Sequence, residues 1–142
     1  MSAFAKRFAG IDTSAITAAI YEGVSTKTYD ERVEKQLVRQ YARSQGWEIR
    51  EFAEEETGKH ASRAAYRQLF KAASRREVNI VLVWSLDRFA REGVEEAFLR
   101  IKKLLDYGIQ FESLSEPHFR TIGPAGKLMI AIVDLFAKAF LS

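Results

Sequence analysis

The stretch Val78-Asn79-Ile80-Val81-Leu82-Val83-Trp84 decides the fold of this chain. Every residue in it except Asn79 is apolar, and most are β-branched. A short continuous run of this kind is typical of a parallel strand that is covered by helices on both faces. We therefore predict a central strand over residues 78–84.

The segments around this strand alternate between extended and helical patterns. Apolar residues recur at helical spacing in three segments, and turn residues such as Gly46 and Gly108 end two of them. In chain order we expect a strand over 16–21, a helix over 30–44 with Asp30 as its N-cap, a strand over 47–53, a polar loop over 54–62, a helix over 66–73, the central strand, a helix over 94–105 and a strand over 109–114. This alternation predicts a three-layer α/β domain with a mostly parallel sheet of four or five strands flanked by helices.

The last predicted helix, over 125–141, differs from the others. Its polar side chains Lys127, Asp134 and Lys138 share one narrow stripe, and the rest of its surface is apolar. Such a helix either is buried within one chain or packs against another chain. We expect a long C-terminal oligomerisation helix, and the alternative is a helix that covers the core of a monomer.

The composition excludes several classes of protein. The chain has 142 residues, of which 47% are hydrophobic and 29% charged, as expected for one globular domain. It has no cysteine, which excludes a disulfide scaffold and a thiolate zinc site, and its two histidines leave little for a histidine metal site. No apolar stretch is long enough to span a bilayer, and residues 1–15 lack a signal-peptide core. We expect a soluble cytoplasmic protein, and its net charge of +3 permits an anionic partner without requiring one.

Candidate functional residues lie in the loops that follow the predicted strands, where sites of open α/β sheets form. These loops contain Ser25, Arg63, Asp87, Arg88 and Arg91. A serine hydroxyl can attack a phosphodiester while guanidinium groups neutralise the charge that develops on its oxygens. A carboxylate can orient an arginine or, when protonated, donate to the leaving oxygen. The ordinary alternative is a turn serine and a helix cap with a salt-bridged arginine.

Four stretches of the chain resemble the serine recombinase catalytic domain of the resolvase and invertase family. Residues 21–26 and the helix that follows resemble its opening, and residues 84–91 resemble its Leu-Asp-Arg signature with a second arginine three positions later. Ser62-Arg63, followed by Tyr66 and Leu69, is similar to the segment with another active-site arginine. Residues 123–129 resemble the start of its long dimerisation helix. The resemblance covers residues 16–136.

The resemblance implies that Ser25 is the nucleophile and forms a 5′-phosphoserine bond to DNA. It implies that Arg63, Arg88 and Arg91 bind the scissile phosphate, with Asp87 beside them. The partners would be double-stranded DNA and a homodimer that assembles to a tetramer, with no metal, small-molecule cofactor or membrane. We expect an N-terminal arm over 1–15 and a catalytic domain over 16–142 that ends within the long helix, with the family's DNA-binding domain absent.

The sequence departs from the family pattern at three places. Gly23, with Glu22 beside it, stands where the family has an arginine, Glu34 stands where a glutamine is usual, and Phe140 and Leu141 stand where an acidic residue and an arginine are expected. Because a guanidinium at position 23 could reach the same phosphate, we expect slow cleavage and expect Gly23→Arg to increase covalent adduct formation.

Two alternatives to an active recombinase remain at this stage. Gly23 and Glu22 suggest a catalytically impaired relative that serves as a DNA-associated oligomerisation module. The carboxylates of Glu54, Glu55 and Glu56 could bind a metal together with Asp87, as in a metal-dependent nuclease.

In addition, four basic residues at helical spacing could face phosphates or simply solvent: Arg32, Lys35, Arg39 and Arg43.

Overall fold

A computed structural model describes residues 16–23, 28–54, 56–57, 60–61 and 63–141. Four parallel strands form the main sheet in the order β2-β1-β5-β6. These strands are β1 (Thr17–Glu22), β2 (Glu48–Ala53), β5 (Ile80–Val83) and β6 (Gln110–Ser113). The predicted parallel sheet is confirmed, and β5 is an interior strand whose four residues are all buried.

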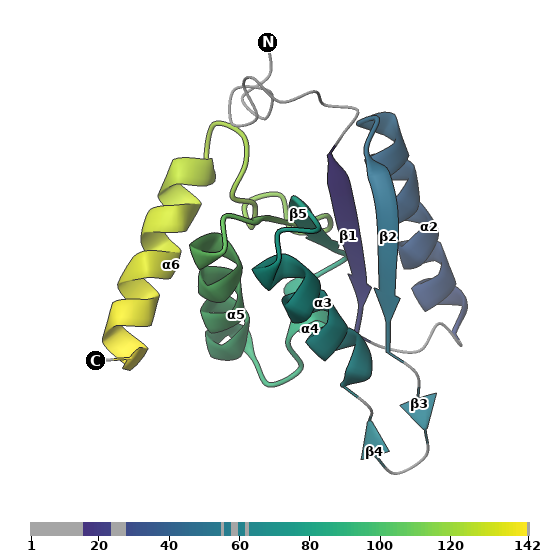
Figure 1. Ribbon diagram of the computed structural model, residues 1–142, viewed down its shortest axis with the longest axis horizontal. Helices are drawn as coiled ribbons and strands as arrows, with labels where there is room; N and C mark the ends of the chain where they lie inside the picture. Colours follow the sequence, from purple (N-terminus) through teal and green to yellow (C-terminus); the bar gives the residue numbers. More distant parts are fainter. Residues whose placement is uncertain (1–15, 24–27, 55, 58–59, 62, 142) are drawn as a thin grey trace.

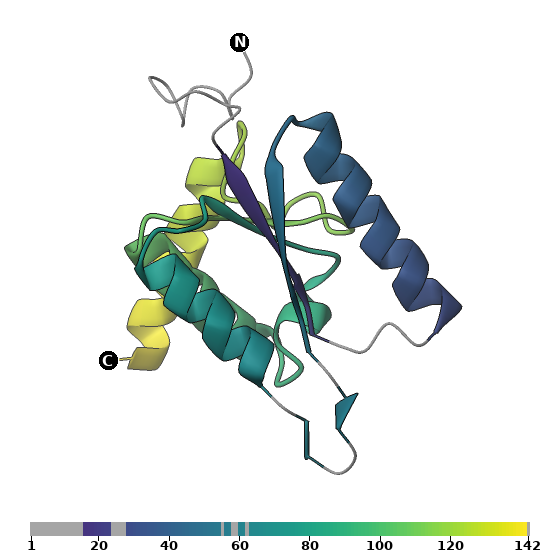
Figure 2. The ribbon, with the colours of Figure 1, turned by 45° about the vertical axis from the view of Figure 1, so that its right-hand side comes forward.

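Helices cover both faces of the sheet, which confirms the three-layer prediction. Helix α2 (Tyr29–Ser44) lies on one face, while α3 (Ala64–Ser74) and α5 (Val94–Asp106) lie on the other (Figures 1 and 2). A one-turn helix, α4 (Leu86–Phe89), follows β5. Each face has its own core: Ile20, Val38 and Leu82 belong to the α2 side, and Leu69 and Phe111 to the other.

Two local predictions were wrong. Helix α2 begins at Tyr29 rather than after Asp30, because Thr28 is the N-cap and its hydroxyl oxygen accepts the backbone N–H of Glu31 at 3.1 Å. The stretch predicted as a loop over 54–62 contains a short antiparallel hairpin of β3 (Glu56–Thr57) and β4 (His60–Ala61). Strands of two residues are too short to leave an alternating pattern in the sequence.

The last helix, α6 (Gly126–Leu141), packs against α5 outside the three layers (Figure 1). Met129, Val133 and Ala137 are buried in this contact, and Lys102 of α5 pairs with Asp134 of α6 at 3.2 Å. The opposite side, which we call the outer face of α6, consists of Leu128, Ile132 and Leu135. Leu128 and Leu135 are 65% and 68% exposed. Among the described helices, none is long and apolar enough to cross a membrane.

Candidate active site

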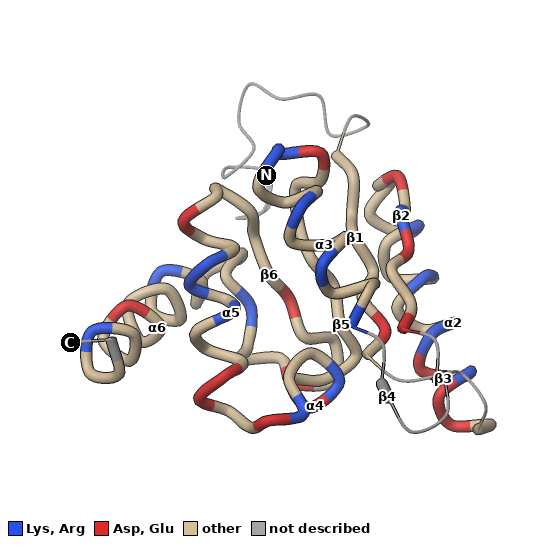
Figure 3. The backbone as a smooth tube through the Cα atoms, turned by 60° about the horizontal axis from the view of Figure 1, so that its bottom comes forward, with Lys and Arg blue, Asp and Glu red and all other residues tan. Residues whose placement is uncertain are grey.

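The predicted site residues lie where the parallel strands end. The segment after β1 leads to Ser25, which lies outside the described residues, and the segment after β5 contains α4 and continues to Arg91. Figure 3 views the molecule from this edge and shows charged residues gathered around α4 and the turn that follows it. Parallel topology alone brings the two segments together, because both strands run in the same direction.

Arg91 joins these two segments directly. Its Nη2 donates a hydrogen bond to the carbonyl oxygen of Gly23 at 2.8 Å, across 68 positions of sequence. Gly23 also lies against the backbone of Arg88: a Cβ atom at position 23 would come within 2.0 Å of the Arg88 carbonyl oxygen. Glycine is therefore required here by close packing of the two segments. An arginine at position 23 would have to displace this backbone, and only the tertiary structure reveals this contact with Arg88.

Arg88 turns toward helix α2. Its Nη2 pairs with the carboxylate of Glu34 at 3.2 Å, while its Nε is buried and has no hydrogen-bond acceptor among the described residues. The hydrogen bond to Glu34 raises the pKa of Arg88 above its ordinary value. Arg88 therefore stays charged at every working pH and keeps a donor that an additional acceptor could use.

Arg88 and Glu34 line a pocket beside the end of β1. The pocket has about 350 Å³ of empty space, part of it open to solvent. Its charged lining residues are Glu22, Glu31, Glu34, Lys35 and Arg88. Three carboxyl groups therefore face two cations, which weakens the attraction of this pocket for an anion.

Arg63 reaches the same edge from the start of α3. Its Nη2 pairs with Glu92 at 2.9 Å, and Glu92 follows Arg91 directly in the chain. Arg63 is about half exposed, so its guanidinium is accessible from solvent. The structure thus brings Arg63, Arg88 and Arg91 to one edge of the sheet, and partners from this chain hold all three.

Asp87 is exposed and accepts a hydrogen bond from the hydroxyl of Ser85. The described residues show no ion pair between Asp87 and an arginine. The start of α4 is held by Glu116, a residue that sequence analysis missed. One oxygen of Glu116 accepts the N–H of Leu86 and the hydroxyl of Ser113, both at 2.7 Å. No pattern in the sequence marks the contact of Glu116 with α4, because Leu86 lies 30 positions away.

The residues proposed for a metal site have other roles or lie outside the described residues. Glu54 accepts the hydroxyl of Tyr21 at 2.8 Å and the backbone N–H groups of Ala65 and Tyr66, so it caps the start of α3. Glu55 and the side chain of Glu56 are not among the described residues. The described part of the chain contains no group of three or more acidic or histidine side chains that could hold a metal ion.

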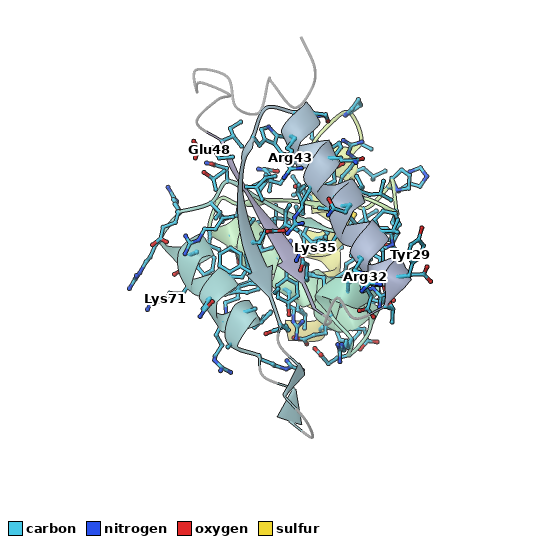
Figure 4. All side chains as sticks on the ribbon, turned by 90° about the vertical axis from the view of Figure 1, so that its right-hand side faces the viewer. Tyr29, Arg32, Lys35, Arg43, Glu48 and Lys71 are labelled. Carbon is cyan, nitrogen blue, oxygen red and sulfur yellow. The ribbon has the colours of Figure 1, made fainter. Side chains whose placement is uncertain are left out.

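The basic residues of α2 divide into two groups. Lys35 lies between α2 and the sheet (Figure 4) and pairs with Glu22 at 3.3 Å, and Arg39 forms a two-pronged pair with Glu51. Arg32 and Arg43 are exposed. The four residues therefore do not form one continuous basic surface.

Glu22 is nine-tenths buried at the end of β1, and neither of its oxygens has a hydrogen bond with good geometry to another described residue. Burial raises the pKa of its carboxyl group, an effect that Lys35 opposes. In contrast, the hydrogen bonds from Arg39 lower the pKa of Glu51. These two carboxyl groups provide a matched pair for testing the electrostatics of the fold.

The two carboxyl groups predict opposite effects of pH on stability. Because folding raises the pKa of Glu22, the stability that this group contributes is present at low pH and is lost as the pH rises through its folded pKa. Glu22→Gln should therefore raise the melting temperature relative to the unchanged chain, by about 3–5 °C at pH 7.5, with no advantage near pH 4.

Glu51→Gln should lower the free energy of unfolding by about 0.2–1 kcal/mol at neutral pH. Thermal melts between pH 4 and 8 measure both, and parallel curves for all three proteins would contradict the assignment.

A known protein family and several solved structures match this chain. The family model "Resolvase, N terminal domain" matches residues 18–141. The N-terminal catalytic domain of TP901-1 integrase superposes with a TM-score of 0.67 at 26% identity, over 86% of this chain and 94% of that one. No curated protein matches the chain by sequence.

Two further solved structures share the fold at lower identity. A resolvase family site-specific recombinase from Streptococcus pneumoniae has a TM-score of 0.65 at 22% identity, over 87% of both chains. The C-terminal catalytic domain of ISC1926 TnpA, an IS607-like serine recombinase, has a TM-score of 0.57 at 24% identity, over 70% of this chain and 69% of that one. The family match, which extends over nearly the whole chain, and the arrangement of arginines at the end of β1 lead to one conclusion: this chain belongs to the resolvase family and corresponds to its N-terminal domain.

Proposed function

We propose that this chain is the catalytic domain of a site-specific DNA recombinase that cleaves and rejoins DNA through Ser25. The observation that carries the proposal is the contact of Arg91 with Gly23. This contact places the arginine-bearing segment after β5 against the backbone two residues before the serine. A nucleophile and the cations that neutralise its target then belong to one site.

In the proposed reaction the Ser25 hydroxyl oxygen attacks the scissile phosphorus and loses its proton. The bond from phosphorus to the 3′ oxygen breaks, the 3′ oxygen leaves as a hydroxyl after gaining a proton, and the 5′ phosphate stays on the serine. Attack by a 3′ hydroxyl on this ester reverses the step and rejoins the strand. The energy of the phosphodiester is conserved in the ester, so rejoining the strand consumes no nucleotide.

The arginines would stabilise the negative charge that develops on the non-bridging oxygens. Arg63 and Arg88 are now paired with Glu92 and Glu34, so a phosphate must compete with these carboxylates. The Nε of Arg88 has no acceptor among the described residues, but it is buried, so a phosphate would reach it only after the side chain moves. We assign Asp87 to orienting the segment or to protonating the leaving oxygen.

Denaturing electrophoresis tests this function. The chain is incubated with supercoiled plasmid DNA, with and without EDTA, and a Ser25→Ala variant is treated in parallel. We expect a covalent protein–DNA band that resists EDTA and is absent from the Ser25→Ala sample. Cleavage that EDTA abolishes, without a covalent band, would instead indicate a metal-dependent nuclease.

A second candidate is an impaired relative that binds DNA and oligomerises without cleaving. The acidic lining of the pocket beside Arg88 and the glycine at position 23 favour it. This candidate predicts no covalent band from the unchanged chain.

The proposed partners are double-stranded DNA, in the cytoplasm at the nucleoid, and further copies of the chain. Resolvase-family membership implies self-association, and we propose dimers that assemble to a tetramer through α6. The outer face of α6 supports this, since exposed large apolar residues at helical spacing commonly mark an interface.

Substitutions on the outer face of α6 should reduce oligomer size. Leu135→Glu or Ile132→Glu would place a charge in the proposed interface, which should weaken association at least tenfold, the effect of about 1.4 kcal/mol. Phe136, by contrast, packs against Phe98 with ring centroids 5.0 Å apart, so Phe136→Glu would also disturb the contact between α5 and α6.

Sedimentation velocity measures this effect, with Lys138→Glu as a control that changes charge in the polar stripe of the same helix. The unchanged chain should sediment as an oligomer at tens of micromolar, and the control should match it. A monomeric unchanged chain in this range would refute the interface.

A further inference from the structure

Helix α5 carries a charged residue on its buried side. Arg100 is only 6% exposed and lies among the apolar residues Ala97, Ile101 and Leu104 of the same helix. Burying a guanidinium is costly unless acceptors surround it, and an apolar side chain could fill such a position at less cost. Packing alone therefore does not explain why an arginine stands at position 100.

Every part of the Arg100 guanidinium has a partner. Its Nη1 donates to the carbonyl oxygen of Phe89 at 2.7 Å, its Nη2 donates to one oxygen of Glu92, and its Nε donates to Glu96 at 3.3 Å. The flat face of the group lies over the ring of Tyr66, with 4.3 Å from Cζ to the ring centroid. Only a planar group with several donors can satisfy these partners at once.

Phe89, Glu92 and Tyr66 belong to the segments that carry the proposed phosphate ligands, whereas Glu96 lies on α5 itself. Phe89 is the last residue of α4 and lies between Arg88 and Arg91 in the chain. Glu92 uses its other oxygen to hold Arg63 at 2.9 Å, so one carboxylate is shared by Arg63 and Arg100. Tyr66 belongs to α3, just after Arg63.

We propose that Arg100 is a positioning residue that fixes the segment after β5 and, through Glu92, the guanidinium of Arg63 in one rigid arrangement. Arg100 is buried in the protein and itself binds no phosphate. The proposed phosphate ligands come from the segment around Arg63 and from the segment after β5. These segments are distant in sequence, and Arg100 contacts both of them. The proposal rests on the proposed function for the role of Arg63, but the contacts that it invokes can be tested separately.

Four variants of the full chain separate positioning from simple stabilisation. Arg100→Met removes every donor and keeps the length of the side chain, and Arg100→Lys keeps the charge with a single ammonium group. Glu92→Gln lies at an exposed position and weakens the carboxylate link between Arg63 and Arg100 while leaving the Arg100 side chain itself unchanged. Lys102→Met is the matched control, because Lys102 lies on the same helix and pairs with Asp106 and Asp134 rather than with either loop.

The first measurement is the side-chain NMR signal of the Arg63 Nε–H group. Arg100→Met and Glu92→Gln should both shift this signal and increase its mobility, and Lys102→Met should leave it unchanged. An unchanged Arg63 signal in Arg100→Met, or in Glu92→Gln if the former does not fold, overturns the proposal. This result does not depend on DNA cleavage.

The second measurement is the rate of covalent adduct formation on supercoiled plasmid DNA, well below each melting temperature. Misplacement of a catalytic group by about 1 Å costs on the order of 100-fold, so we expect a loss of that order for Arg100→Met, a smaller loss for Arg100→Lys and a rate within about twofold for Lys102→Met. If Arg100→Met lowers the melting temperature but reacts at the unchanged rate, the residue only stabilises the fold and the proposal fails. If the unchanged chain forms no adduct, the proposed function fails, and the Arg63 signal still decides whether Arg100 positions that side chain.

Discussion

Replacing Arg88 with alanine should lower the rate of covalent adduct formation by about 100- to 1000-fold. Loss of one donor that stabilises transition-state charge costs roughly 2–4 kcal/mol, and Arg88 is placed at the end of β1 with a buried Nε that lacks an acceptor among the described residues. Arg91→Ala should have a similar effect, and it also removes the hydrogen bond to Gly23. Quantified denaturing gels measure both rates.

Controls separate chemistry from folding in this experiment. Arg43 is exposed at the far end of α2, so Arg43→Ala should keep the rate within about twofold. Thermal melts show whether the Arg88 and Arg91 variants still fold, since Arg88 is partly buried against Glu34 and Arg91 is bonded to Gly23. Wild-type rates in these variants would remove the two arginines from the site, and failure to fold would assign them a structural role.

Glu34→Gln should increase the rate of covalent adduct formation. Its carboxylate now neutralises Arg88, and an amide of the same shape would leave that charge available to a phosphate. We expect a several-fold higher adduct rate, since Arg88 and Glu34 are only 29% and 17% exposed and their pair contributes at least the roughly 0.2–1 kcal/mol of an exposed ion pair. A lower rate would show that Glu34 positions Arg88 rather than competing with the substrate.

Substitutions at Gly23 should have the largest effect on stability. A Cβ atom there would lie 2.0 Å from the carbonyl oxygen of Arg88 and 3.1 Å from its carbonyl carbon, and backbone cannot yield as a flexible side chain can. We expect Gly23→Ala to cost about 1–3 kcal/mol of unfolding free energy or more. Gly23→Arg carries the same Cβ, so it should lower stability and displace Arg88 instead of increasing adduct formation as the family pattern suggested.

Gly46→Ala is the comparison for this steric effect. Gly46 has a φ of 79°, and a Cβ atom added to it would meet nothing within 4 Å, so its substitution carries only the backbone cost of about 1–2 kcal/mol. It should leave the adduct rate per folded molecule unchanged, whereas Gly23→Ala should lower that rate as well as the melting temperature. A Gly23→Arg protein that melts normally and reacts faster would show that the end of β1 can move away from Arg88.

The sequence by itself determined the layers of this protein. The apolar run over 78–84 predicts a buried strand, and apolar residues at helical spacing predict the helices around it. Both patterns arise because each side chain prefers either water or the core, and this preference is local and recurs along the chain. The same pattern identified the apolar surface of α6. It also placed Arg63, Asp87, Arg88 and Arg91 after strand ends, because parallel topology assigns those segments to one edge. The structure corrects one detail, since Asp87 and Arg88 lie in the one-turn helix α4 and not in a loop.

Only the tertiary structure decided how these residues are held. Arg88 meets Glu34 across 54 positions of sequence, and Arg91 meets Gly23 across 68. Glu54 resembled a metal ligand in the sequence, yet it caps α3. No sequence pattern singled out Arg100, which is buried and donates to the carbonyl oxygen of Phe89. The physical reason is that a charged side chain selects its partner by distance and desolvation, and both are set only when separate segments pack together.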